Sequence, residues 1–161
     1  MSRLKGMRGF SLIELMVAIA LLSIAAGIAI PNLARMVRNG QLESQAQTLG
    51  SLLQFARSEA VIRRTPVTIS AASNTWTVST ASETLRREEF TDAQVTISST
   101  LSPISLAFTS SGSASAASFI LCRDNESEFA YLLTVQPSGG IRLHQRGKDA
   151  DDLTNLGDCT P

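Results

Sequence analysis

A single apolar segment near the N-terminus constrains this chain more than any other feature. From Phe10 to Ile30 the residues are almost wholly apolar, and Glu14 is the one formally charged residue between Phe10 and Pro31. At a helical rise of about 1.5 Å per residue, a segment of this length spans roughly 30 Å, which matches the hydrocarbon core of a bilayer. The sequence therefore predicts a membrane-spanning helix.

The flanking residues leave three interpretations of this segment open. Basic residues precede it at Arg3, Lys5 and Arg8. This is typical of a cleaved secretory signal, an ordinary membrane anchor, or a leader that is removed ahead of the apolar helix. Ala18-Ile19-Ala20 resembles a secretory cleavage site, but the apolar residues continue well beyond it. An ordinary anchor does not explain Glu14, because a carboxylate at mid-bilayer costs roughly 2.5–3.5 kcal/mol and is usually there for a partner.

The residues at the start of the apolar segment resemble the processing signal of type IV pilins and pseudopilins. Gly9 is followed by Phe-Ser-Leu-Ile-Glu from Phe10 to Glu14, then by an uninterrupted apolar run and Pro31. In this family an inner-membrane prepilin peptidase cuts after the glycine, and the new N-terminal phenylalanine is N-methylated. The resemblance implies a leader over residues 1–9, cleavage between Gly9 and Phe10, methylation of Phe10, and a helix kink at Pro31.

The same resemblance gives Glu14 a role in assembly. Its carboxylate is expected to pair with the α-amino group of Phe10 on a neighbouring subunit, which neutralises two buried charges at once. Glycine suits the cleavage site, because a peptidase can hold a backbone without a side chain very closely. The retained helix would first anchor the protein in the inner membrane and later form the core of a filament.

Beyond Pro31 the apolar residues follow the spacing of an amphipathic helix. The expected buried face holds Leu42, Ala46, Leu49, Leu53, Ala56 and Ala60. We expect one helix from Phe10 to about Arg63, with a transmembrane and assembly part at residues 10–31 and an amphipathic part at residues 32–64. Thr65-Pro66 should end it. Arg57 and Glu59 are interpreted as part of a solvated helix face with weak pairing.

After Pro66 the apolar period changes to two, which is typical of strands. The expected strands contain Val67 and Ile69, Trp76 and Val78, Val95 and Ile97, Leu106–Phe108, Phe119–Leu121, Tyr131–Val135, and Ile141–Leu143. Ser138-Gly139-Gly140 predicts a hairpin turn between the last two strands. The sequence thus predicts an α+β fold of the type IV pilin kind, in which the long helix packs on an antiparallel β-sheet head at residues 65–161.

Cys122 and Cys159 are the two cysteines of the chain, and both lie in the expected head. An even count beyond an export signal favours a disulfide in an oxidising compartment, whereas two reduced, buried cysteines are the alternative. A disulfide would tie the acidic tail, Gly147 to Pro161, to the strand that ends at Cys122. In the chain-entropy account such a bond stabilises the head by about 4 kcal/mol.

The end of the helix carries a second, finer resemblance. Residues Leu52 to Ala60 end in Ala-Arg-Ser-Glu-Ala, which is similar to the helix end of the GspH/FimT/FimU group of minor pilins and pseudopilins. Ser138–Leu143 and the near-terminal Cys159 resemble the ending of the same group. The resemblance, closest in type to FimU, implies a minor type IV pilin that helps to initiate or prime pilus assembly near the pilus tip. Its partners would be other minor pilins and the major pilin; a minor pseudopilin of type II secretion is an alternative.

DNA binding for uptake in natural transformation is the other alternative within this group. FimT-like proteins use a C-terminal Gly-Arg-x-Arg motif, and Gly140-Ile141-Arg142 breaks that motif here. A basic patch remains at Arg142, His144, Arg146 and Lys148. Arg142, Arg146 and Lys148 are the candidate DNA-binding residues, because such a patch could bind phosphates in a salt-dependent way. The aspartates that follow oppose this, so a solvated strand end is the favoured interpretation.

The composition and motifs predict neither an enzyme nor a cofactor or metal site. His144 is the only histidine and has no carboxylate or nucleophile partner at motif spacing, and two cysteines with one histidine lack the usual zinc spacing. The formal net charge is zero, so the chain is not a globally basic nucleic-acid binder. We expect a single-pass inner-membrane protein with a periplasmic head that later enters a pilus or pseudopilus.

Overall fold

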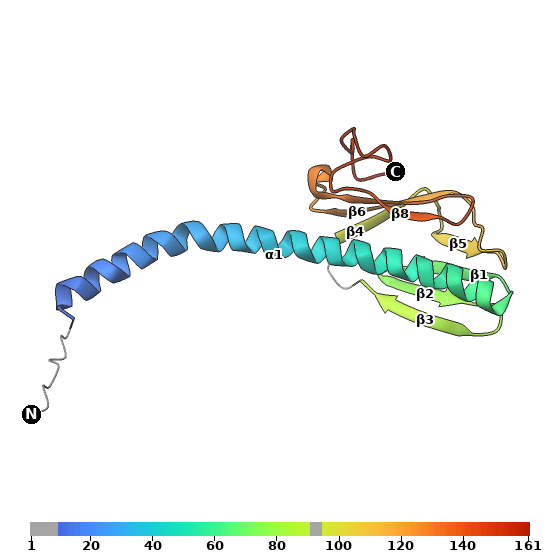
Figure 1. Cartoon of the computed structure of the whole chain (residues 1–161), viewed down its shortest axis with the longest axis horizontal. Coiled ribbons are helices and arrows are strands. Elements are labelled where there is room, and N and C mark those ends of the chain that lie inside the picture. The colour runs from blue at the N-terminus through green and yellow to red at the C-terminus, as the bar shows by residue number, and fades with distance from the viewer. Residues whose placement is uncertain (1–9, 91–94) are drawn as a thin grey trace, which may run out of the picture. The chain divides into compact units, whose positions relative to one another are not determined.

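The computed structural model describes residues 10–90 and 95–161. Its main chain forms a long helix, eight strands and one short 3-10 helix (Figure 1). The chain divides into two compact units, Met1–Arg38 and Asn39–Pro161, and the long helix contributes to both.

The long helix, α1, runs from Leu12 to Arg63 without a break in its assignment. This confirms the predicted helix, with a start two residues later than expected. Glu14 lies in its first turn and Arg63 in its last, so each charge complements the helix dipole. Pro31 lies inside α1, and the kink expected there stays a prediction.

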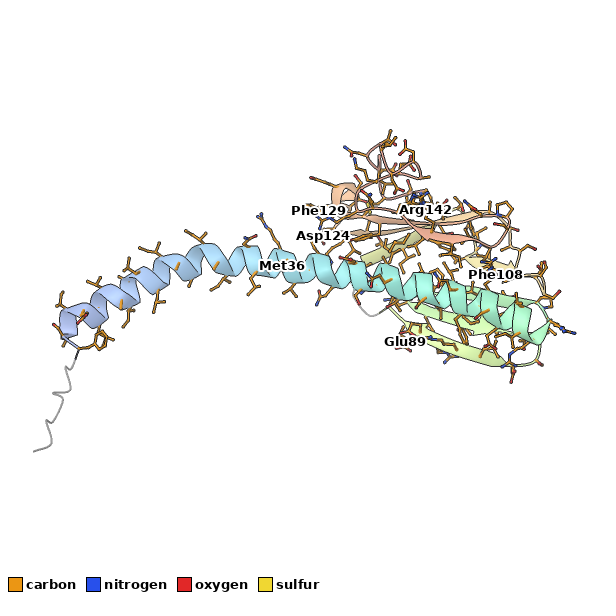
Figure 2. All side chains as sticks on the ribbon, viewed as in Figure 1. Met36, Glu89, Phe108, Asp124, Phe129 and Arg142 are labelled. Atoms are coloured by element: carbon orange, nitrogen blue, oxygen red, sulfur yellow. A yellow bond between two sulfur atoms is a disulfide. The ribbon has the colours of Figure 1, made fainter. Side chains whose placement is uncertain are left out.

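From Leu12 to Arg38 the first unit is a largely apolar part of α1. Most of its large apolar side chains are more than half exposed. Figure 2 shows side chains projecting from the helix on either side of the labelled Met36. Within the described residues, α1 is the one helix long and apolar enough to cross a membrane. Exposed apolar area of this extent is unfavourable in water, so this unit requires lipid or other subunits around it.

The second unit contains two four-stranded antiparallel sheets. The first has the order β3-β2-β1-β5, from β1 (Val67–Ala72), β2 (Thr75–Ser79), β3 (Thr84–Glu89) and β5 (Ser105–Phe108). The second has the order β4-β6-β7-β8, from β4 (Val95–Ser99), β6 (Ala117–Arg123), β7 (Tyr131–Val135) and β8 (Ile141–Leu143), with η1 (Ser127–Phe129) before β7. The α+β fold with an antiparallel head is confirmed, although the strands form two sheets rather than one.

Strand β3 was not predicted, because it lacks alternating apolar residues. Its sequence is Thr-Leu-Arg-Arg-Glu-Glu, and Leu85 is its single apolar residue. It pairs with β2 and lies at the outer edge of its sheet. Charged side chains are common on edge strands because they discourage pairing with other chains, so β3 follows the rule for edges rather than the rule for half-buried strands.

The main core lies between the C-terminal half of α1 and the two sheets. All six residues of the predicted helix face are buried, each at most 1% exposed: Leu42, Ala46, Leu49, Leu53, Ala56 and Ala60. Trp76 packs edge-on against Phe90 and Phe119, with ring centroids 6.0 and 5.7 Å apart. The apolar face of the amphipathic helix therefore packs against the sheets of the head, as the sequence predicts.

Strands β6 and β7 are covered on both faces. Phe119, Leu121 and Leu133 belong to the main core under α1. The alternate residues form a second, smaller cluster with the C-terminal tail: Ile120, Cys122, Ala130, Leu132, Leu156 and Cys159. Because side chains alternate between the faces of a sheet, the tail covers the face that α1 does not reach. In their middle parts, Phe119–Cys122 and Tyr131–Leu133, the two central strands are therefore apolar at every position.

Candidate functional site

The first turn of α1 contains the residues expected to direct assembly. Phe10 lies two residues before the first residue of α1 and is 80% exposed, and the Leu15 N–H donates to the Ser11 carbonyl at 3.2 Å. Glu14 is exposed among the apolar side chains of this unit. Four residues of helix rise about 6 Å, so an α-amino group at Phe10 would lie roughly one turn from the Glu14 carboxylate. Gly9 lies outside the described residues.

Cys122 and Cys159 are joined by a disulfide, with their Cα atoms 5.8 Å apart. The bond links the end of β6 to the tail across 37 residues of sequence. The hydroxyl of Ser98, on the neighbouring strand β4, also donates to the Cys159 carbonyl. The tail is thereby fixed to two neighbouring strands of the second sheet, to β6 by a covalent bond and to β4 by a hydrogen bond.

Arg57 is not part of a solvated helix face, and that interpretation is wrong. Its Nε donates to the Gly112 carbonyl at 3.1 Å, and its Nη2 donates to the Ser138 carbonyl at 3.1 Å. Gly112 belongs to the loop before β6, and Ser138 to the turn between β7 and β8. One guanidinium thus joins the end of α1 to two loops of the head, which the fixed fork of arginine donors makes possible.

Glu59 does form the exposed ion pair that was expected. Its carboxylate accepts from Arg63 Nε at 2.6 Å, and Arg63 Nη1 also reaches Glu83 at 2.5 Å. The neighbouring carboxylates raise the pKa of Arg63, with the Glu59 hydrogen bond as the main cause. Ion pairs this exposed contribute little to stability because water and salt screen them, so Arg57 is the stronger link at this end of the helix.

The basic patch after β8 is held together by one carboxylate of the tail. Asp152 accepts from Arg142 Nη2 and from the Gln145 N–H, the latter at 3.1 Å, and it lies 3.1 Å from His144 Nδ1. These bonds lower the pKa of Asp152, the Gln145 N–H contributing most. The Arg142 side chain remains 62% exposed. Its charge is therefore compensated within the chain while its outer surface stays accessible.

Arg146 and Lys148 lie apart from that carboxylate. The Arg146 guanidinium stacks over the Phe129 ring, 5.5 Å from its centroid. Lys148 Nζ donates to the Leu153 carbonyl at 3.1 Å and to Asn155 Oδ1 at 2.9 Å. The structure does not gather the candidate DNA-binding residues into one free cationic surface, because each is engaged by a separate contact within the head.

His144 has the partners that the sequence did not reveal. The side chain is 2% exposed, and its Nε2 lies 2.9 Å from the Thr134 hydroxyl while Nδ1 faces Asp152. This order of hydroxyl, imidazole and carboxylate resembles a nucleophile with its base. The two contacts satisfy both ring nitrogens of a buried polar side chain, as buried polar groups require. Among the described residues no group of three metal-ligating side chains occurs.

Two family models match this sequence, one over the N-terminal apolar segment and one over most of the head. The family model of the type II transport protein GspH matches residues 45–139, which is more than half of the chain. The model of the prokaryotic N-terminal methylation motif matches residues 4–30. No curated protein sequence matches the chain significantly.

Solved structures share the fold. The type IV minor pilin FimU of Pseudomonas aeruginosa aligns in one crystal form with a TM-score of 0.64 and 24% identity, over 77% of this chain and 98% of that chain. In a second crystal form the TM-score is 0.60 and the identity 25%, over 73% and 99%. The minor pseudopilin EpsH from the type II secretion system of Vibrio cholerae aligns with a TM-score of 0.55 and 15% identity, over 69% and 98%, and shows the fold alone.

From Leu12 to Ile30 the methylation-motif match lies on the exposed apolar part of α1, and the GspH match covers the end of α1 from residue 45 together with most of both sheets. The chain belongs to the GspH family and is a minor pilin or pseudopilin of the GspH/FimT/FimU type.

Proposed function

We propose that this protein is a minor type IV pilin that helps to initiate or prime pilus assembly near the pilus tip. In this proposal prepilin peptidase cleaves between Gly9 and Phe10, and Phe10 is then N-methylated. The protein is held in the inner membrane by α1 with its head in the periplasm until it enters the filament. The likeness to the minor pilin FimU supports the type IV pilus over type II secretion.

One observation carries the proposal: a lone carboxylate in the first turn of an exposed apolar helix. Glu14 has no basic side chain near it in sequence between Phe10 and Pro31. Cleavage before Phe10 would create an α-amino group about one turn away, and it is the charge that can compensate Glu14 inside lipid or a filament. A neighbouring subunit shifted by roughly one turn would present its amino group at the same level, which fixes the axial position of the two helices.

The cleavage step has a direct test. Protein isolated from cells with an active prepilin peptidase should begin at an N-methylated Phe10 when its N-terminal peptide is examined by mass spectrometry. A mature chain that begins beyond Ala20 would instead identify an ordinary secretory signal. Gly9→Val should block processing, because the added side chain obstructs close binding of the backbone.

The charge pair is tested by Glu14→Ala, measured as the ratio of protein in sheared filaments to protein in membranes. We expect membrane levels to be unchanged and incorporation to fall at least tenfold, since breaking a buried pair costs about 3–5 kcal/mol. Ser23→Ala is the matched control, because it removes a polar group from the same helix whose hydroxyl bonds only to the Ile19 carbonyl. Equal incorporation of the Glu14 variant would refute the pair.

Type II secretion is the second candidate, favoured by the family match to GspH over residues 45–139. The two functions predict different losses in a strain that lacks the protein. A minor pilin is required for surface filaments and leaves secretion intact, whereas a minor pseudopilin is required for the release of secreted proteins. Measuring both in one deletion strain, with the restored gene as control, separates them.

DNA binding remains a weaker candidate, carried only by the exposed surface of Arg142 and the nearby Arg146 and Lys148. Gel shifts at several salt concentrations with the wild type and with a triple Ala variant would test it. Binding that disappears in the triple variant and falls steeply with salt would favour DNA uptake. Equal, weak shifts for both proteins would exclude these residues.

A further inference from the structure

Strand β8 presents an open edge of the second sheet. Its register with β7 pairs Thr134 with Arg142, and the flanking bonds run from the Gln136 N–H to the Gly140 carbonyl and from the His144 N–H to the Leu132 carbonyl. In an antiparallel ladder, inward and outward residues alternate. Arg142 therefore bonds to β7, and the N–H and C=O groups of Ile141 and Leu143 point outward. Within the described part of the chain, no segment pairs with them.

Two other strand edges of the head are protected. Strand β3 carries four charged side chains in succession, from Arg86 to Glu89. Strand β5 is followed by a loop that folds back, so that Phe108 pairs with Ala114 in an isolated bridge. Exposed edges invite the addition of another strand, and natural proteins block those that must stay free. Strand β8 has neither a run of charges nor a covering bridge.

A groove with both apolar and polar lining borders this edge on the side of α1. Its volume is about 450 Å³, and its lining comes from Gln54, Arg57, Ser58, Val61, Ile62 and Ile141. Val61 is 47% and Ile62 74% exposed, although both lie on the half of α1 that packs on the head. Ile141 and Leu143 pack partly against the main core. Side chains added opposite them would extend that core into the groove.

The other face of the edge has the opposite character. Arg142 alternates with Ile141 and Leu143, and its side chain points toward the tail, where Asp152 accepts from only one side of it. A residue placed directly opposite Arg142 on an added strand would face a largely exposed guanidinium. Cross-strand pairs of opposite charge are stabilising, so an acidic residue fits this position.

We propose that β8 is a docking edge for an extended segment of another pilin subunit, which adds as a fifth strand with an apolar-acidic-apolar sequence. The apolar residues lie opposite Ile141 and Leu143, and the acidic residue lies opposite Arg142. Main-chain bonds supply affinity and the alternating side chains supply specificity, as in other strand additions. The inference rests on the proposed role in filament assembly, because it concerns the partner of the head in that filament.

The test is a substitution that alters only the outward edge. Leu143→Pro removes the outward N–H and leaves the bonds of Arg142 to β7 intact, and proline is tolerated at this kind of edge position. Leu143→Ala is the matched comparison, since it also removes the leucine side chain but keeps the N–H, so the difference between the two variants isolates the outward hydrogen bond. In cells with the full assembly system, incorporation of the Pro variant into sheared filaments should fall at least about fivefold below that of the Ala variant, the factor for one net hydrogen bond.

Hydrogen–deuterium exchange gives a second measurement that does not depend on a variant. In the purified full chain in detergent, the amides of Ile141 and Leu143 should exchange rapidly, and in isolated filaments they should be protected at least tenfold. Rapid exchange in filaments would overturn the proposal. Protection that rises with the concentration of the purified chain alone would also overturn it, because the occupant would then be a second copy of this chain.

The outcomes separate this inference from the proposed function. If wild-type protein never enters filaments, the pilin assignment fails before β8 is tested. If wild type and Leu143→Pro enter equally well, with equal membrane levels, the docking edge is refuted while the assembly role stands. If the Pro variant does not accumulate in membranes, the exchange measurement decides instead, because it uses the wild type.

Discussion

Arg57 provides the sharpest test of how the head is held to its helix. Its guanidinium donates to two main-chain carbonyls, at Gly112 and Ser138, each at 3.1 Å. Hydrogen bonds from a charged group contribute about 1.5–3 kcal/mol when buried and less when exposed. The bond to Gly112 is partly buried and the bond to Ser138 is exposed, so we assign about 1.5 and 0.5 kcal/mol to them. Arg57→Met, which keeps the length of the side chain, should therefore destabilise the head by about 2 kcal/mol.

Trp76 makes this change measurable. It is the single tryptophan, and it is buried against Phe90 and Phe119, so its fluorescence reports unfolding of the head core. With a urea slope of about 1–3 kcal/mol per molar, a loss of 2 kcal/mol lowers the midpoint by about 1 M. The neighbouring Ser58→Ala is the control, because the Ser58 hydroxyl bonds only to the Phe55 carbonyl within α1. A midpoint for Arg57→Met within 0.2 M of wild type, at unchanged slope (roughly the error of such fits), would refute the reasoning.

Three further perturbations test other parts of the head by the same fluorescence assay. Cys122→Ser with Cys159→Ser should lower the free energy of unfolding by up to about 4 kcal/mol, with chemical reduction of the wild type giving the same loss. The pKa of Asp152 is lowered in the folded head, so its ionised carboxylate stabilises the fold fully above the ordinary pKa of 3.8. This stabilisation is lost as the pH falls through the lower pKa of the folded state. Asp152→Asn should therefore remove this part of the decrease in unfolding free energy at acid pH. Gly139→Ala should cost at least about 2 kcal/mol, because Gly139 has φ +76° and an added Cβ would lie 1.8 Å from the Gly112 carbonyl oxygen, whereas Gly140→Ala should be well tolerated.

The helix and most strands were predictable because each follows one local period. The buried face of α1 has helical spacing throughout, and Thr65-Pro66 ends it where expected. Strand β3 was not predicted because an edge strand buries few apolar side chains and therefore shows no apolar period. Its charged residues instead discourage pairing with other chains. The division into two sheets also depends on contacts between distant strands, such as Val95 with Arg123, which no local period encodes.

The candidate site shows the same limit at the level of single residues. Gly9, Phe10 and Glu14 stay predictions, and they could be made because the motif that contains them lies within six successive residues of the sequence. Arg57 was misinterpreted because its acceptors are 55 and 81 residues away, and both are main-chain carbonyls that carry no sequence signal. The partners of His144 were missed for a related reason.

Asp152 follows His144 by eight residues, and Thr134 precedes it by ten. Neither spacing belongs to a regular element, since the contact with Asp152 depends on how the tail folds back and the contact with Thr134 on the pairing of β7 with β8. The acidic residues of the polar tail were predicted to weaken DNA binding. The structure shows how one of them opposes it, by compensating Arg142 directly.

The two units of the chain require different environments, because the first exposes its apolar side chains and the second buries them. The head buries its own apolar side chains, because α1 covers one face of the second sheet and the disulfide-bound tail covers the other. The first unit cannot do so, because its side chains are exposed around the whole helix. In the function proposed above, lipid covers these side chains in the bilayer, and in the filament a neighbouring subunit would cover them while its processed N-terminus compensates Glu14. On that proposal the carboxylate favours a position beside a neighbouring subunit and so contributes to the step from bilayer to filament.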